Sequence, residues 1–275
     1  YLAMGVILVL SDKRWVRPQS HQANVTLLVT GVGTGLVFML KPEIFLALAA
    51  GIITVPVTRY LTGDWKKSYP NGPFKPILIF ISGAFLSYLF AVIVLATNQP
   101  LGTATANATG AWRFIFEGSV SNTTFYHFTS GFDFPLKNLG KALLQAFLIT
   151  IPISLIYIVS RLRTVVCIPV SVAILTIPIL AFESINWHEL TRGLPVVMFV
   201  ILSLIVLVRL KTGLRRPSKL DSTGLNSDTV LHFTELCPLI IFSLAMLLKI
   251  ILFSRIYHYG FTLGMPAFLV LTCFI

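Results

Sequence analysis

Charged residues are scarce in this chain. Of its 275 residues only 11% are Asp, Glu, Lys or Arg, whereas a soluble domain carries about 25%. So few charges do not cover a water-exposed surface, and an ordinary soluble domain is therefore excluded. The hydrophobic fraction is 56% and the mean hydropathy is +0.86, and both values are typical of a protein that crosses a membrane several times.

Cysteine pairs and familiar catalytic patterns are missing as well. Cys167, Cys237 and Cys273 are isolated in apolar segments, without the CxxC or Cys/His spacing of a metal site or a disulfide framework. The sequence contains no HExxH, GxSxG or DxD, so it does not support a zinc protease or a serine triad. The glycines of Gly31-Val-Gly-Thr-Gly35 lie inside an apolar run, where the GxxxG spacing predicts close helix packing rather than a phosphate loop.

Long apolar runs make up most of the sequence, and a bilayer-spanning helix needs about 20 mostly apolar residues. The runs are Tyr1–Leu10, Thr26–Leu40, Ile44–Leu61, Pro76–Thr97, Ala142–Ser160, Val165–Phe182, Leu194–Leu210, Thr229–Leu252, and a last one from Phe261 to Ile275. We expect an all-α polytopic integral membrane protein with about eight to nine transmembrane helices, several of them short or broken.

Both ends of the chain lie inside apolar runs, at Tyr1 and Ile275. Natural termini are uncommon in the middle of a bilayer. We therefore expect an internal or C-terminal part of a longer protein, with residues 1–275 forming a single transmembrane domain.

Lysine and arginine define the expected topology, because basic residues concentrate in cytoplasmic loops. Fourteen of the 21 basic residues fall in alternate loops, around 13–17, 59–75, 161–163 and 209–219. The others are Lys41, Arg113, Lys137, Lys141, Arg192, Lys249 and Arg255. These seven lie in the intervening connections, which we expect to face the periplasm or lumen. The net charge of +11 follows from this arrangement, so no nucleic-acid partner is expected.

Two longer connections interrupt the apolar runs. Residues 98–139 form the expected outer loop, whose aromatic residues suit a segment lying on lipid headgroups. Residues 211–228 are rich in Pro, Ser, Gly and charge and predict a flexible cytoplasmic linker. Within the outer loop, Glu117 and Asp133 leave binding of an acceptor or a divalent cation open. No other cofactor and no metal site are expected.

Lys41-Pro42-Glu43 is a charged triplet between two apolar runs, with no room for an ordinary loop. Charges at a membrane edge are costly, and two interpretations explain these. In the structural one, a helix ends near Lys41, whose side chain reaches the headgroups, and Pro42 starts the next helix. In the functional one, Lys41 contacts the phosphate of a lipid-linked substrate as a compact point charge, and Glu43 positions it.

A second group of candidates lies late in the chain. Arg255 and His258 are three residues apart and would share one face of a helical turn, with Tyr257 between them. Arg grips phosphate bidentately and His relays protons, although an aromatic and basic headgroup anchor explains the same residues. Lys249 either reaches the headgroups or joins this cationic cluster. Arg192 is a further supporting candidate on the outer side.

Two stretches resemble a known family. Gly35-Leu-Val-Phe-Met-Leu-Lys-Pro-Glu43 resembles the G-L-x-x-L-T-K-P-E stretch of polytopic GT-C glycosyltransferases, the group that includes protein O-mannosyltransferases and the lipid A aminoarabinose transferase. Arg255-Ile-Tyr-His-Tyr-Gly-Phe-Thr-Leu-Gly-Met-Pro266 looks like a second stretch that occurs late in some bacterial relatives. The chain departs from the first pattern at Met39-Leu40, where the family often has a Thr just before the Lys.

The resemblance implies an enzyme that moves a sugar from a polyprenyl-phosphate donor to an unidentified acceptor, on the outer face of a bacterial plasma membrane. It implies inverting chemistry, donor-phosphate contacts from Lys41, Arg255 and His258, and a catalytic base in a first outer loop that would precede Tyr1. The alternative is a transporter, flippase or polymerase-like carrier of lipid-linked sugars. A structural membrane subunit without a site is the third interpretation.

Overall fold

The computed structural model describes residues 2–11, 21–61, 72–118, 122–159, 191–214, 227–251 and 260–274, with a few isolated positions between 169 and 189. Within these ranges the regular structure is entirely helical. The helices are α1 (Leu2–Ser11), α2 (His21–Leu40), α3 (Pro42–Leu61), α5 (Phe74–Ala96), α6 (Leu101–Ala108), α7 (Gly110–Phe116), α8 (Thr124–Ser130), α9 (Pro135–Val159), the 3₁₀ turn η1 (Thr191–Gly193), α12 (Leu194–Leu214), α13 (Ser227–Ile250) and α14 (Gly260–Phe274).

Five described helices are long and apolar enough to cross a membrane: α2, α3, α5, α9, and η1 with most of α12. Shorter apolar helices cover Leu2–Ser11, Leu236–Ile250 and Leu263–Thr272. The predicted all-helical membrane architecture is therefore confirmed. The count of eight to nine spans stays a prediction, because most of the predicted segment Val165–Phe182 lies outside the described residues.

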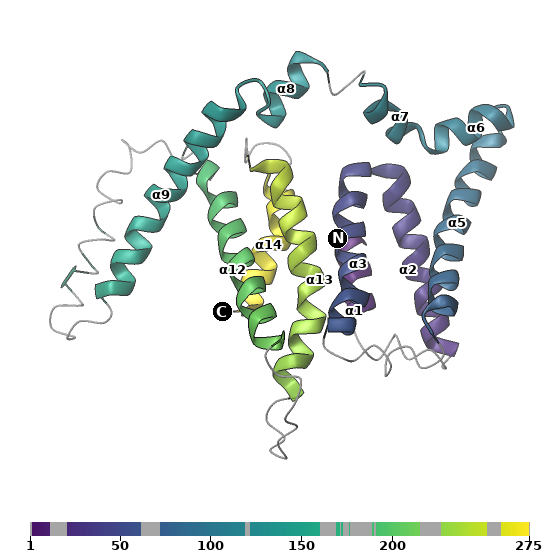
Figure 1. Cartoon of the computed structure of the whole chain (residues 1–275). Helices are drawn as coiled ribbons and strands as arrows, with labels where there is room; N and C mark the ends of the chain where they lie inside the picture. Colours follow the sequence, from purple (N-terminus) through teal and green to yellow (C-terminus); the bar gives the residue numbers. More distant parts are fainter. Residues whose placement is uncertain are drawn as a thin grey trace.

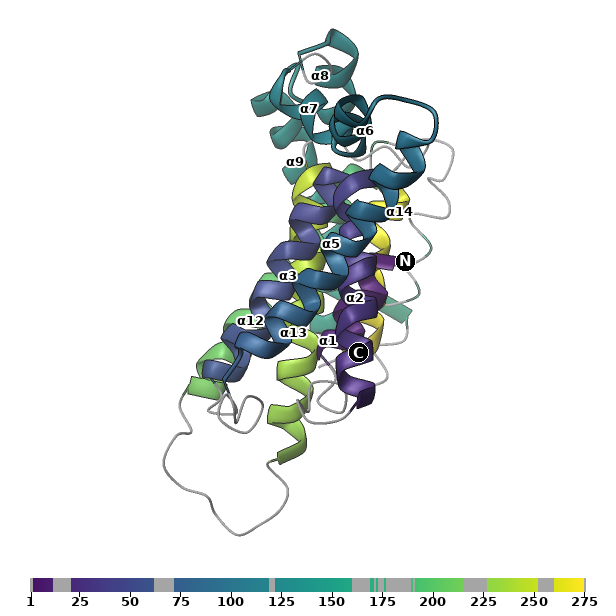
Figure 2. The same ribbon diagram turned by 90° about the vertical axis from the view of Figure 1, so that its right-hand side faces the viewer.

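The long helices run side by side in an elongated bundle, and α6, α7 and α8 lie across one end of it (Figures 1 and 2). We call this end, which also carries the turn between α2 and α3, the Lys41 end. The opposite end, where α1 and α3 finish, is the Arg59 end. Across the bundle, α5 packs on α2, α2 packs on α1 and α3, and these two pack on α13. α14 and α12 also pack on α13, and α9 packs on α12.

Several helices extend beyond the apolar runs that predict them. α2 begins at His21 rather than at Thr26, and α9 begins at Pro135 rather than at Ala142. A backbone that leaves the bilayer as a helix keeps its hydrogen bonds satisfied, so polar residues can extend the helix into the headgroup region. For the same reason the expected outer loop 98–139 is itself mostly helical, through α6, α7, α8 and the first turn of α9.

Glycines bring α2 and α5 into backbone contact, as the GxxxG spacing predicts. A Cβ atom on Gly31 would lie 2.1 Å from the carbonyl oxygen of Phe80, and one on Gly35 would lie 2.5 Å from that of Ala84. From the other helix, a Cβ on Gly83 would lie 2.2 Å from the carbonyl oxygen of Leu28. Only a hydrogen atom in place of a side chain permits the two backbones to approach this closely. The resulting van der Waals packing attracts helices to one another in lipid.

The apolar core lies where α1, α3, α12 and α13 meet. Ile7, Leu48, Leu202, Ile240 and Leu247 have no exposed surface and belong to one continuous cluster. Large apolar side chains elsewhere, on α5 and α9 above all, are exposed, as expected of helices that face lipid rather than water.

Arg59 is buried near the end of α3, with 2% of its surface exposed. Its Nη2 donates to the carbonyl oxygens of Leu10 and Ser11, at 3.3 and 3.5 Å. These carbonyls belong to the last described turn of α1, at the negative end of the helix dipole, where a guanidinium is stabilised. Sequence analysis groups Arg59 with the loop cations, whereas the structure shows it as the cap of a neighbouring helix.

Gly83→Ala tests the α2–α5 contact against a matched change at Gly5, whose Cβ position on α1 has no atom within 4 Å. Alanine raises helix propensity by about 1 kcal/mol at either site. At Gly83 the new methyl meets backbone that cannot move aside, and overpacking costs about 1–3 kcal/mol. We expect Gly83→Ala to lower the free energy of unfolding in mixed micelles, and Gly5→Ala to leave it unchanged or raise it. A stabilising Gly83→Ala change would contradict the close contact.

Candidate functional site at the Lys41 end

The turn between α2 and α3 consists of a single residue, Lys41. α2 ends at Leu40 and α3 begins at Pro42. The backbone N–H of Lys41 donates to the Val37 carbonyl at 3.0 Å, and the Lys41 carbonyl accepts from the N–H of Phe45 at 2.9 Å. Both backbone groups of the turn are therefore bonded, and the exposed Lys41 side chain stands at the end of the bundle. The structural interpretation of Pro42 as the first residue of a helix is confirmed.

Trp112 completes the end of α2. In a continuous helix the carbonyl of Phe38 would accept from the N–H four residues later, but that residue is Pro42, which has none. The indole Nε1 of Trp112, in α7, donates to the Phe38 carbonyl at 2.8 Å. This satisfies a group that hydrocarbon would leave unpaired and attaches the α6–α8 segment to the α2–α3 turn.

Four aromatic rings surround this hydrogen bond. Phe38 and Phe45 meet edge to face with centroids 5.0 Å apart, and Trp112 lies 5.0 Å from Phe38 and 5.8 Å from Phe45. Phe116 stacks on Trp112 at 6.1 Å. Edge and offset contacts of this kind add about 0.5–1.5 kcal/mol per pair beyond area burial. The sequence predicts an interfacial helix or a loop on the headgroups for the aromatic residues of 98–139, and Trp112 lies on helix α7. The donor that Pro42 lacks is the sequence signal that points to its contact with Phe38.

Glu43 and Lys249 form an ion pair between α3 and α13. The distance from Lys249 Nζ to Glu43 Oε1 is 3.0 Å, with side chains 40% and 34% exposed. Each charge also suits its helix terminus, since an anion is stabilised in the first turn of α3 and a cation in the last turn of α13. Lys249 thus lies beside the Lys41 turn, and two ammonium groups flank one carboxylate at this end.

Arg192, another cation at the Lys41 end, contacts a carboxylate. Arg192 Nη2 lies 2.9 Å from Glu189 Oε1. Next to it, Gly193 packs so tightly on α9 that a Cβ atom would lie 2.3 Å from the backbone nitrogen of Ala146. Arg192 is thus paired with the residue three positions before it, on the segment that packs against α9.

The two acidic residues of the outer loop also have partners. Glu117 pairs with Arg113 and raises the pKa of that guanidinium, and an Asp133 oxygen accepts from the Asn138 amide at 2.9 Å. No three His, Cys, Asp or Glu side chains come together among the described residues, so this part of the chain defines no metal site.

Arg255, Tyr257 and His258 lie outside the described residues. Their expected convergence with Lys41 on a donor phosphate therefore stays a prediction. The described site consists of Lys41, the Glu43–Lys249 pair and the Trp112 cluster.

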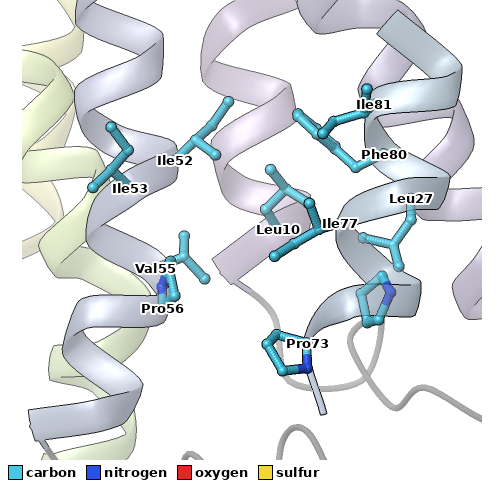
Figure 3. A pocket seen from close by; sticks show the side chains of 11 residues that line it. Leu10, Leu27, Ile52, Ile53, Val55, Pro56, Pro73, Ile77, Phe80 and Ile81 are labelled. Carbon is cyan, nitrogen blue, oxygen red and sulfur yellow. The ribbon is translucent and has the colours of Figure 1, made fainter.

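An apolar groove opens between α3 and α5 nearer the Arg59 end. It has a volume of about 340 Å³ and is lined by apolar side chains and prolines. Ile52, Ile53 and Pro56 of α3 face Ile77 and Ile81 of α5 across the space, as Figure 3 shows. Leu10 of α1 and Leu27 of α2 form its back wall. With no charged group in its lining, the groove suits hydrocarbon rather than a polar ligand.

Comparison with known proteins gives no relative: no family model, no curated protein and no solved structure matches the chain. The function is therefore inferred from the geometry of the site and the sequence resemblance described above.

Trp112→Phe keeps the ring and removes the hydrogen bond to Phe38. We expect α7 to open more readily, by about 1–2 kcal/mol for a lost bond to a buried carbonyl, seen as faster amide hydrogen exchange across Gly110–Phe116. Phe114→Leu is the control, because that side chain is exposed on the same helix. Unchanged exchange in Trp112→Phe would show that the indole bond does not hold α7.

A double-mutant cycle tests the ion pair with Glu43→Gln, Lys249→Gln and the double variant. Because both side chains are partly exposed, we expect a coupling of about 0.2–1 kcal/mol in the free energy of unfolding. A coupling of zero would contradict a stabilising role for the pair.

Proposed function

We propose that the full-length protein is a membrane glycosyltransferase that uses a polyprenyl-phosphate-linked sugar as donor, with Lys41 contacting the donor phosphate. The observation that carries the proposal is the exposed ammonium of Lys41 on a turn whose backbone is fully bonded. A cation carried by a fixed turn at a membrane end is placed to meet a phosphate at headgroup height. The Lys249 ammonium, 3.0 Å from Glu43, adds positive potential to the same end.

The chemistry of such a transfer needs a cation at this place. The bond from the anomeric carbon to the phosphate oxygen breaks, and its electron pair leaves with the polyprenyl phosphate. A fixed positive charge that stabilises the developing phosphate charge more than the bound donor lowers the barrier. The acceptor hydroxyl attacks the anomeric carbon from the opposite face and loses its proton to a base, which we expect in the segment before Tyr1.

The apolar groove supports a donor with a long hydrocarbon chain. From the Lys41 turn, exposed side chains of α3 follow one stripe, through Leu46, Ile53 and Val57, and Ile53 lines the groove. A chain anchored by its phosphate near Lys41 would pack against these side chains along this path, by van der Waals contact as between helices in lipid. Arg255 and His258 are proposed as further phosphate contacts on the basis of the sequence resemblance.

A carrier of lipid-linked sugars is the second candidate. Such a carrier needs polar groups that meet the sugar near the middle of the membrane. The buried hydroxyls of Thr30, Thr34, Ser87 and Ser243 instead donate to carbonyls of their own helices. Within the described residues this favours a phosphate site at the membrane end over a sugar path through the bundle.

Lys41→Ala in the full-length protein tests the proposal. We expect transfer from the polyprenyl-phosphate donor to fall by at least about a hundredfold, the effect of losing one group that stabilises transition-state charge, while membrane insertion stays normal. Arg113→Gln is the control, because Arg113 is exposed at the same end and paired with Glu117. Unchanged transfer by Lys41→Ala in isolated membranes would exclude the role.

Product analysis separates the two candidates. A transferase releases the unglycosylated polyprenyl phosphate and forms a glycosylated acceptor. A carrier moves the labelled donor between leaflets of a vesicle with the sugar–phosphate bond intact, and that result would overturn the proposed transferase.

A further inference from the structure

α9 presents two lysines and a line of apolar side chains on one face. Ala142 and Ala146 form its packed face, against Val196 of α12. At 3.6 residues per turn, Lys137 and Lys141 lie on the opposite side. Both lysines are exposed, in the first two turns of α9 at the Lys41 end (Figure 1).

These two lysines differ from the other cations at this end. Arg113, Arg192 and Lys249 each contact a carboxylate. Lys137 instead lies over the ring of Phe134, with Nζ 5.8 Å from the centroid, and within the described part of the chain neither Lys137 nor Lys141 has an ion-pair partner. The structure thus leaves two neighbouring positive charges uncompensated.

Their positions do not stabilise α9 itself. Two like charges at i and i+4 repel each other, and cations in a first turn oppose the helix dipole. Lysine is also disfavoured on the outer side that the charge pattern predicts for this end. An anion placed between the two lysines would offset both unfavourable effects.

The same face continues into the membrane as hydrocarbon. Below Lys141 the helix exposes Leu144, Leu148, Ile151 and Leu155, with Leu144 57% exposed. Two ammonium groups above an apolar stripe match one kind of molecule, which carries negative charge at headgroup height and an acyl chain beneath it. A free anion would leave the apolar stripe unused.

We propose that this face of α9 binds an anionic phospholipid of the leaflet at the Lys41 end. Its phosphate would lie between Lys137 and Lys141, and an acyl chain would lie along Leu144 and Leu148. This surface is carried by a different helix from the Lys41 site, and the proposal does not depend on the proposed glycosyl transfer.

Fluorescence quenching in vesicles tests the proposal at the site itself. Leu144→Trp places a reporter on the stripe, and the difference from the parent protein isolates its signal from the native tryptophans. The full-length variant is reconstituted in phosphatidylcholine with a brominated acyl chain on either phosphatidylglycerol or phosphatidylcholine. We expect phosphatidylglycerol to quench the reporter preferentially, with an apparent association constant higher by roughly fivefold per lysine, the value for a basic residue beside an anionic bilayer surface.

Two comparisons decide the outcome. Replacing the lysines together, by Lys137→Gln and Lys141→Gln, should reduce the preference to about one, whereas Lys137→Arg with Lys141→Arg should keep it. Leu86→Trp on α5, exposed at a similar depth from the same end, should show no preference in any background. Equal quenching by the two lipids at Leu144→Trp, or a preference that survives the glutamine changes, would overturn the proposal.

Discussion

Backbone hydrogen bonding at the Lys41 turn governs how this end of the bundle is built. In hydrocarbon every N–H and C=O must find a partner within the protein, and a turn of one residue leaves little freedom to provide them. Pro42 removes one donor to the Phe38 carbonyl, and Trp112, 74 positions after Phe38, replaces it. Because α3 must start directly where α2 ends, Glu43 comes to lie opposite Lys249, and the rings of Phe38 and Phe45 meet the indole. The turn that carries the exposed Lys41 side chain is thus fixed by the bonds of its own backbone and by the packing of its neighbours.

The charges of α3 sit at its two ends and act on different helices. At one end Glu43 joins α3 to α13; at the other, Arg59 joins it to α1. Between them the helix carries no charged residue. On α3, charge therefore lies where the helix terminates, and there it compensates a dipole and remains close to the headgroups.

Much of the fold could be predicted from local sequence patterns. Apolar runs predict α3, α5 and α12 well, and the Gly31–Gly35 spacing predicts the contact with α5, because both depend on residues close together in the chain. The partners of Glu43, Arg59 and Trp112 depend on residues 48 to 206 positions away, and no local pattern contains that pairing. Pro42 does indicate part of this pairing, because a proline four residues after Phe38 leaves the Phe38 carbonyl without its helical donor. The start of α9 was missed because its first two turns carry lysines, which an apolar count reads as loop.

The contact of Arg59 with Leu10 and Ser11 also constrains biogenesis. A ribosome delivers α1 to the membrane well before α3 is made, so the last carbonyls of α1 wait for a guanidinium that is not yet synthesised. Until then the two carbonyls are without this donor. Only when α3 arrives can the Arg59 end of this pair be sealed from water. The first three helices are therefore expected to settle into the lipid as one cooperative unit, rather than one at a time.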